Sequence, residues 1–149
     1  MSNLNELLPD AKLFAEKVAQ AEAEEAQRFV RMKEEAEAEK RALLDHYRKP
    51  SGVSDEEGIR RALKIIERGV NNGLTEVQFY RFPNALCTDR GRAINQGEPG
   101  WEKTLTGVPL EIYQLWSRHF RAKGYRLKVE IVDFPDGIPG DVGMTLQWG

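Results

Sequence analysis

The sequence predicts an α+β protein: a long N-terminal helix, followed by a small helix–strand–helix–strand–strand domain with a three-stranded sheet. Residues 1–48 contain no glycine, only one proline, and mostly the strong helix formers Ala, Glu, Lys and Arg. Ten of the aromatic residues lie beyond Arg48, and the last 25 or so residues alternate between apolar and polar side chains, as half-buried strands do. We therefore expect a helical arm over residues 1–48, which is a candidate coiled coil, a linker over residues 49–53 and a compact domain over residues 54–149.

The arm has two candidate starting points. Asn3 followed by Glu6 fits a helix-capping box, and Pro9 with Asp10 fits the first turn of a helix. From Asp10 to Arg48 nothing interrupts the helical pattern. At about 1.5 Å per residue such a helix reaches roughly 58 Å. That length exceeds the diameter expected for the domain that follows, so the sequence predicts an arm that the domain cannot cover.

Apolar side chains on this arm form separated clusters. They are Leu4, Leu7, Leu8, Ala11, Phe14, Ala15 and Val18, then Phe29, Val30 and Met32, and finally Leu43, Leu44 and Tyr47. Charged residues such as Glu22, Glu25, Lys33 and Lys40 stand where a regular heptad requires apolar ones, so the pattern does not predict a continuous zipper. Self-association or docking on a protein partner would cover the clusters, and a frayed, solvated helix is the alternative. The residues expected to make the contact are Leu7, Phe14, Val18, Phe29, Val30, Leu43 and Leu44.

The compact domain is expected to begin with a helix. Pro50 and Gly52 mark the linker, and Ser54 with Glu57 forms a capping box. The spacing of Ile59, Leu63, Ile66 and Val70 predicts the buried stripe of this helix. Asn71 to Gly73 is a helix stop.

The remaining elements are predicted from the positions of proline and glycine and from the period of the apolar residues. Residues 74–82 read as a strand that Pro83 ends, and residues 108–123 read as a helix that Gly124 closes. Its inward-facing residues are predicted to be Ile112, Tyr113, Trp116 and Phe120. Residues 125–134 and 142–148 alternate with period two, which predicts an antiparallel hairpin. The helices are expected to cover one face of the resulting sheet.

Charge is distributed unevenly. Residues 1–48 hold eight Lys and Arg against eleven Asp and Glu, whereas residues 59–128 hold thirteen against six. Basic side chains beside Phe120 and Tyr125 suit contacts with a nucleic-acid backbone and its bases. The candidate residues are Arg60, Lys64, Arg68, Arg118, Arg121, Lys123, Arg126 and Lys128. Solvated helix faces and cations at a helix C-terminus explain the same residues, and a pI of 5.8 is low for a nucleic-acid module. Nucleic acid is therefore an alternative partner.

The segment from Asn84 to Trp101 carries the second alternative, a small anion- or metabolite-binding protein or enzyme. Backbone amides of a short turn, together with Arg90 and Arg92, could receive a carboxylate or phosphate. Asp89 could instead pair with an arginine and close the loop on itself, and Trp101 is either a lid or a core anchor. Cys87 lies nearby, but a buried packing role fits a lone cysteine better than a nucleophile. The candidate ligand-binding residues are Asp89, Arg90, Arg92 and Trp101.

No sequence motif specifies a reaction. The chain lacks the glycine-rich nucleotide loops, the HExxH pattern and paired CxxC motifs, and its two histidines are too few for a three-histidine zinc site. We expect no catalytic residue, metal or cofactor. A single cysteine, no signal-peptide pattern and no apolar run of about 20 residues favour a cytoplasmic protein without a membrane partner. The leading hypothesis is a non-catalytic interaction or adaptor protein that oligomerises or docks a partner through its N-terminal helix.

Overall fold

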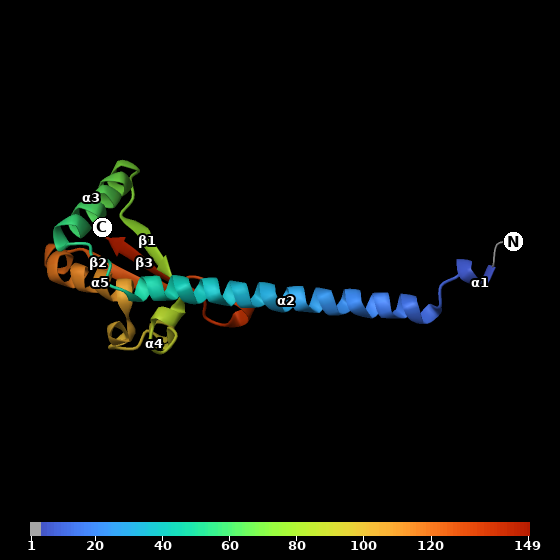
Figure 1. The fold of residues 1–149 in the computed structure, drawn as a ribbon. Coiled ribbons are helices and arrows are strands. Elements are labelled where there is room, and N and C mark those ends of the chain that lie inside the picture. The colour runs from blue at the N-terminus through green and yellow to red at the C-terminus, as the bar shows by residue number, and fades with distance from the viewer. Residues whose placement is uncertain (1–3) are drawn as a thin grey trace. The chain divides into compact units, whose positions relative to one another are not determined.

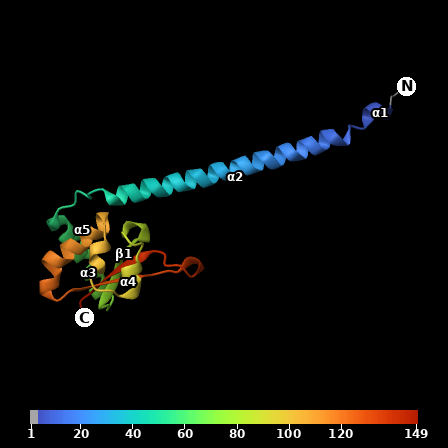
Figure 2. The ribbon, with the colours of Figure 1, turned by 90° about the horizontal axis from the view of Figure 1, so that it is seen from below.

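The computed structural model describes residues 4–149 and confirms the α+β class (Figure 1). Asn3, with its predicted capping box, lies outside the described residues. The contacts divide the chain into two compact units, Met1–Ala42 and Leu43–Gly149. The last turns of the long helix therefore belong to the second unit. Figure 2 gives a second view of the same elements.

The first unit is helical. A short helix α1 spans Leu4–Leu7, and α2 spans Ala11–Arg48 without interruption for 38 residues. The predicted long helix is thus confirmed, and the amide of Leu13 donates to the carbonyl of Asp10 in its first turn. Every residue of α2 from Ala11 to Leu43 is exposed.

The second unit begins with the end of α2 and continues into α3, Asp55–Asn71. The predicted capping box is confirmed at its start, where the Ser54 side chain accepts a hydrogen bond from the Glu57 amide at 3.2 Å. The predicted stop is also confirmed, because Asn72 caps the helix and Gly73 takes a φ of +73°.

The buried face of α3 differs from the predicted stripe. Leu63 and Val70 are exposed, with 47% and 53% of their surfaces accessible, and the prediction for them was wrong. Ile66 is buried and Ile59 packs beside it, as predicted, and the packed face also includes the small residues Gly58 and Gly69. A Cβ on Gly58 would lie 2.7 Å from the side chain of Leu115, and one on Gly69 would lie 2.8 Å from the ring of Trp148. These glycines let the helix approach its neighbours closely.

Three antiparallel strands form the sheet in the order β1-β3-β2. They are β1 (Glu76–Phe82), β2 (Arg126–Ile131) and β3 (Val142–Gln147). β2 and β3 form the predicted antiparallel hairpin. β1 pairs with the other edge of β3, so the C-terminal strand lies in the centre of the sheet. A bulge interrupts the register of β1 between Gln78 and Tyr80.

The connection from β1 to β2 contains more helix than predicted. It holds η1 (Asn84–Leu86), α4 (Arg92–Gln96) and η2 (Trp101–Thr104) before α5 (Gly107–Leu115). The helix predicted over residues 108–123 continues from α5 through a π-helical turn, η3 (Trp116–Phe120), and a 3-10 turn, η4 (Arg121–Lys123). It ends as predicted at Gly124, whose φ is +90°.

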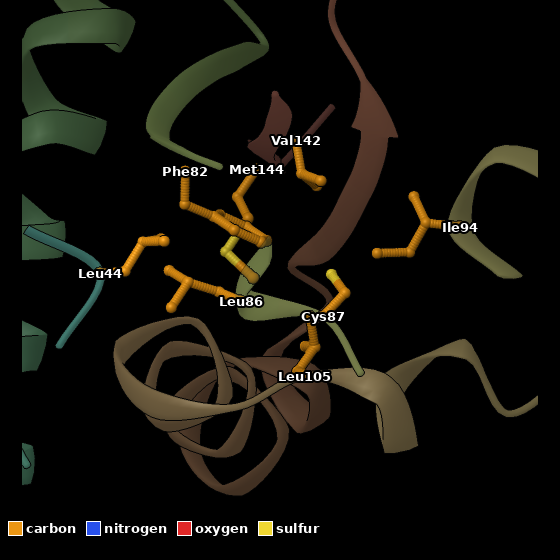
Figure 3. Close-up of a cluster of buried hydrophobic side chains, with 8 residues drawn as sticks. All are labelled: Leu44, Phe82, Leu86, Cys87, Ile94, Leu105, Val142 and Met144. Carbon is orange, nitrogen blue, oxygen red and sulfur yellow. The ribbon is translucent and has the colours of Figure 1, made fainter. Parts of the chain in front are cut away.

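Side chains from one face of the sheet make the core of the second unit, together with the helices that cover that face. Figure 3 shows the larger cluster, which joins the sheet to the end of α2, to α4 and to the segments around η1 and η2. Its buried members are Leu44, Phe82, Leu86, Cys87, Ile94, Leu105, Val142 and Met144. A smaller cluster of Ile66, Phe120 and Leu146 joins α3 to the far end of the sheet.

Candidate functional site

The largest set of uncovered apolar side chains lies on the long helix. Large exposed apolar residues occur on it in three groups, which are Leu13, Phe14 and Val18, then Phe29, Val30 and Met32, and finally Leu43. Leu4, Leu7 and Leu8 precede them and are at least 70% exposed. Apolar side chains exposed in such number are typical of surfaces that meet another molecule.

One residue of the predicted contact set is not available. Leu44 is only 8% exposed, since it packs with Phe82 and Leu86 in the core of the second unit. This is a correction to the predicted arm: the neighbouring Leu43 points away from that core and is 49% exposed. Adjacent positions on a helix face directions about 100° apart, so one residue can be core while the next is surface.

The Asn84–Trp101 segment is held by its own side chains. The Asp89 carboxylate accepts hydrogen bonds from the amides of Gly91 at 3.0 Å and of Ala93 at 2.9 Å, the second of which lies in the first turn of α4. It therefore occupies the amide donors that an external anion was predicted to use. Arg92 forms an ion pair with Glu98 at 3.0 Å.

The other two predicted ligand-binding residues, Arg90 and Trp101, have different surroundings. Arg90 is exposed, with a φ of +57° that is rare for a non-glycine residue. Trp101 is half-buried and packs edge-on against Tyr113, with ring centroids 5.6 Å apart. Of the two roles predicted for Trp101, this contact is that of a core anchor.

Cys87 is a buried side chain next to this segment. It is 3% exposed, and its backbone bridges to Leu105. Burial raises the pKa of the Cys87 thiol to about 11, an effect to which nearby Asp89 adds and which a hydrogen bond with Thr104 opposes. The thiol is therefore protonated at neutral pH and is a poor nucleophile.

We expect the thiol of native Cys87 to resist a maleimide or disulfide reagent at pH 7 and to react fully once the chain is unfolded in denaturant. The chain has one cysteine, so the labelling signal reports this site alone. Rapid stoichiometric labelling of the native protein would contradict the burial described above.

Most of the predicted nucleic-acid-binding residues have partners within the protein. Arg60 pairs with Glu56, Lys128 with Glu130, and the guanidinium of Arg126 donates to the carbonyl of Gly149. The guanidinium of Arg121 lies 4.7 Å from the ring centroid of Trp116. Lys64, Arg68 and Lys123 are exposed. The eight residues are spread over α3, η3, η4 and β2.

Arg118 belongs to a charged cluster that ties α3 to the π-helical turn. Its guanidinium donates to both carboxylate oxygens of Asp55, at 3.2 and 2.9 Å, and His119 Nε2 lies 2.7 Å from the same carboxylate. The hydrogen bond from Arg118, followed by that from His119, holds the pKa of Asp55 below its usual value. Both contacts stabilise the ionised form of Asp55.

The second unit also contains a cleft that the sequence did not predict. It has a volume of about 570 Å³ and lies between α3, β1 and α5, with walls that include Ile65, Phe79 and Ile112. The bulge in β1 places Phe79 and Tyr80 consecutively on the covered face of the sheet. Two adjacent aromatics in a strand that otherwise alternates were the available signal in the sequence.

Tyr80 also lines this cleft, and its hydroxyl is unusual. Within residues 4–149, the buried Oη of Tyr80 has no hydrogen-bond partner. Burial, with Tyr47 adding to it, raises the pKa of Tyr80 to about 12. The side chain is therefore a neutral phenol at physiological pH.

Comparison of the chain with models of protein families, with curated proteins and with solved structures finds no match. Over residues 4–149, no group of three or more His, Cys, Asp or Glu side chains is arranged to hold a metal ion. In the same part of the chain, no helix is both long and apolar enough to cross a membrane. The structure is that of an α+β protein with a long N-terminal helix that carries exposed apolar side chains.

Proposed function

We propose that this protein is a non-catalytic interaction or adaptor protein that oligomerises or docks a protein partner through α2. The observation that supports the proposal is the exposure of large apolar side chains, Phe14 and Phe29 among them, along a helix whose single buried residue is Leu44. Helices in proteins owe most of their stability to packing of an apolar face. A partner would supply that packing along the first unit.

The free energy gained by burying several of these side chains is large enough to drive association. Burying one side chain such as Phe, Leu, Val or Met stabilises by roughly 1.5–3 kcal/mol. Several such residues on one helix can therefore offset the cost of association, which is about 4–15 kcal/mol. Without a partner, the same surface remains in water.

The two alternatives are supported less well. Nucleic-acid binding would use basic residues of which Arg60, Arg118 and Lys128 already pair with carboxylates. A metabolite-binding protein or enzyme would use a segment whose Asp89 and Arg92 are engaged within the chain. Neither alternative accounts for the exposed apolar residues of α2.

The proposal is tested with the full chain by sedimentation equilibrium over a wide concentration range. We expect a concentration-dependent oligomer, or binding to a protein partner, that Phe29→Glu weakens by tenfold or more because a buried charge replaces an apolar contact (about 1.4 kcal/mol per tenfold). The matched control is Leu63→Glu, which places the same charge on an exposed leucine of α3. A monomer at every concentration, with α2 amide protons that exchange freely and no partner lost on Phe29→Glu, would contradict the proposal.

A further inference from the structure

The large apolar residues of α2 fit a period of eleven better than a period of seven. Spacings of eleven connect three sets: Phe14, Glu25 and Ala36; Val18, Phe29 and Lys40; and Ala21, Met32 and Leu43. At about 100° per residue these nine positions share one face of the helix, which we call the seam. Its apolar members with large side chains are Phe14, Val18, Phe29, Met32 and Leu43, all exposed. Leu13 and Val30 lie off the seam.

This period explains why the heptad pattern fails on the same helix. An 11-residue repeat has about 3.67 residues per turn, which is closer than the 3.5 of a heptad to the 3.6 of a straight helix, so its seam drifts less around the helix along its length. The heptad that keeps Val18, Phe29, Met32 and Leu43 inside would also place Glu22, Glu25 and Glu39 inside. With the period of eleven, the charged residues at seam positions are Glu25 and Lys40, and Glu22 and Glu39 lie at the two edges of the same face.

We propose that the partner of the seam from Val18 to Leu43 is a second copy of this chain, aligned antiparallel and centred between Met32 and Lys33. With this centre Phe14 comes level with residue 51, past the end of α2. The inference rests on the proposed function, and it specifies the partner and its orientation. That centre sets Glu25 of one copy level with Lys40 of the other, and Phe29 level with Ala36. Opposite charges therefore meet, and a large side chain meets a small one, at symmetric places along the seam.

The flanks of the seam agree with the same centre. Arg28 of one copy comes level with the gap between Glu35 and Glu39 of the second copy, on the same side of the pair. Lys33 comes level with its own counterpart near the axis. Its long stem can lie along the seam while the ammonium reaches water, so this position does not oppose the arrangement.

The same residues disfavour a parallel pair in register. In a parallel pair in register, Glu25 would face Glu25 and Lys40 would face Lys40. Like charges held in an interface cost several kcal/mol. The charges in the seam therefore favour the antiparallel pair over the parallel one.

Single cysteines distinguish the two orientations, because the native Cys87 is buried at 3% exposure. At 1.5 Å per residue, the two copies of residue 32 lie about 1.5 Å apart along the antiparallel axis, and the two copies of residue 18 lie about 44 Å apart. We expect Met32→Cys to form an interchain disulfide under mild oxidation and Val18→Cys to form none. A mixture of Glu25→Cys with Lys40→Cys should yield the heterodisulfide. Self-linked Val18→Cys would overturn the inference.

Charge reversal provides the second test. We expect Glu25→Lys and Lys40→Glu each to weaken the dimer by about tenfold or more, and the double variant to recover dimerisation, because it restores both opposite pairs. In a parallel pair the double variant would recover nothing. Gln27→Ser, an exposed position on the opposite side of α2 from the seam, is the control and should change the dissociation constant by less than about twofold.

The outcomes separate the inference from the proposed function. A dimer with the wrong disulfides, or one that the double charge reversal does not rescue, overturns the antiparallel pair and leaves the interaction function standing. A chain that stays monomeric but binds another protein through Phe29 also overturns the antiparallel pair and leaves the interaction function standing. A chain with no partner of either kind removes both.

Discussion

Gly107→Ala is expected to lower the free energy of unfolding of the second unit by about 3 kcal/mol. Gly107 begins α5 with a φ of +60°, where a side chain is strained. A Cβ there would also lie 2.2 Å from the carbonyl oxygen of Tyr47 and 2.8 Å from the Cα of Arg48. These are backbone atoms, which cannot rotate away as the end of a side chain can. The last turn of α2 would therefore have to move off α5.

Gly124→Ala is the matched control for this prediction. Gly124 has a φ of +90°, but a Cβ at this position would meet nothing within 4 Å. Only the backbone strain remains, which costs about 1–2 kcal/mol. Urea unfolding followed by tryptophan fluorescence measures both variants, since Trp101, Trp116 and Trp148 all lie in the second unit. Equal losses for the two variants would show that the contact with Tyr47 adds nothing to the strain.

Local signals account for the part of the fold that the sequence predicted. The cap at Ser54, the stop at Gly124 and the alternation of the β2–β3 hairpin each depend on residues close together in the chain. The position of β1 beside β3 depends on pairing between residues some 60 or more positions apart. Short-range patterns do not contain that information, so the strand order was not predictable.

The buried face of α3 was predicted only in part, because Ile59 and Ile66 pack as predicted whereas Leu63 and Val70 do not. Leu63 and Val70 fit an apolar stripe, yet the helix packs through Gly58 and Gly69 because close approach to Leu115 and Trp148 requires the absence of a side chain. Counting apolar residues gives no weight to glycine. The apolar periodicity of α3 therefore included the exposed Leu63 and Val70 and left out the two packed glycines.

The prediction of the candidate sites was limited in the same way, to features that depend on residues close together in the chain. The exposed apolar residues of α2 were predictable because a helix of 38 residues follows from composition alone. The cleft beside Phe79 was not, since it requires a bulge in β1 and the approach of three separate elements. The hydrogen bond that Asp89 accepts from the first turn of α4 was not predicted, because α4 is only five residues long and has no hydrophobic repeat.

Leu44→Ala is expected to destabilise the second unit by about 2–4 kcal/mol, whereas Leu43→Ala should change its stability by less than about 0.5 kcal/mol. Leu44 is 8% exposed and packs against the cluster around Phe82 and Leu86, so its truncation leaves a cavity in the core. Leu43 is 49% exposed and has no such packing to lose. Urea unfolding at a protein concentration below that of association measures the difference.

The same pair of variants separates folding from association. Leu43 belongs to the seam, so Leu43→Ala should weaken self-association while the unfolding curve of the monomer stays unchanged. Leu44→Ala should lower the stability of the monomer but leave self-association unchanged under conditions where the second unit remains folded. Leu44 faces the core and not the seam. If Leu44→Ala left the unfolding midpoint unchanged, the end of α2 would not be part of the second unit, and the boundary between the units would move from Ala42 towards Arg48.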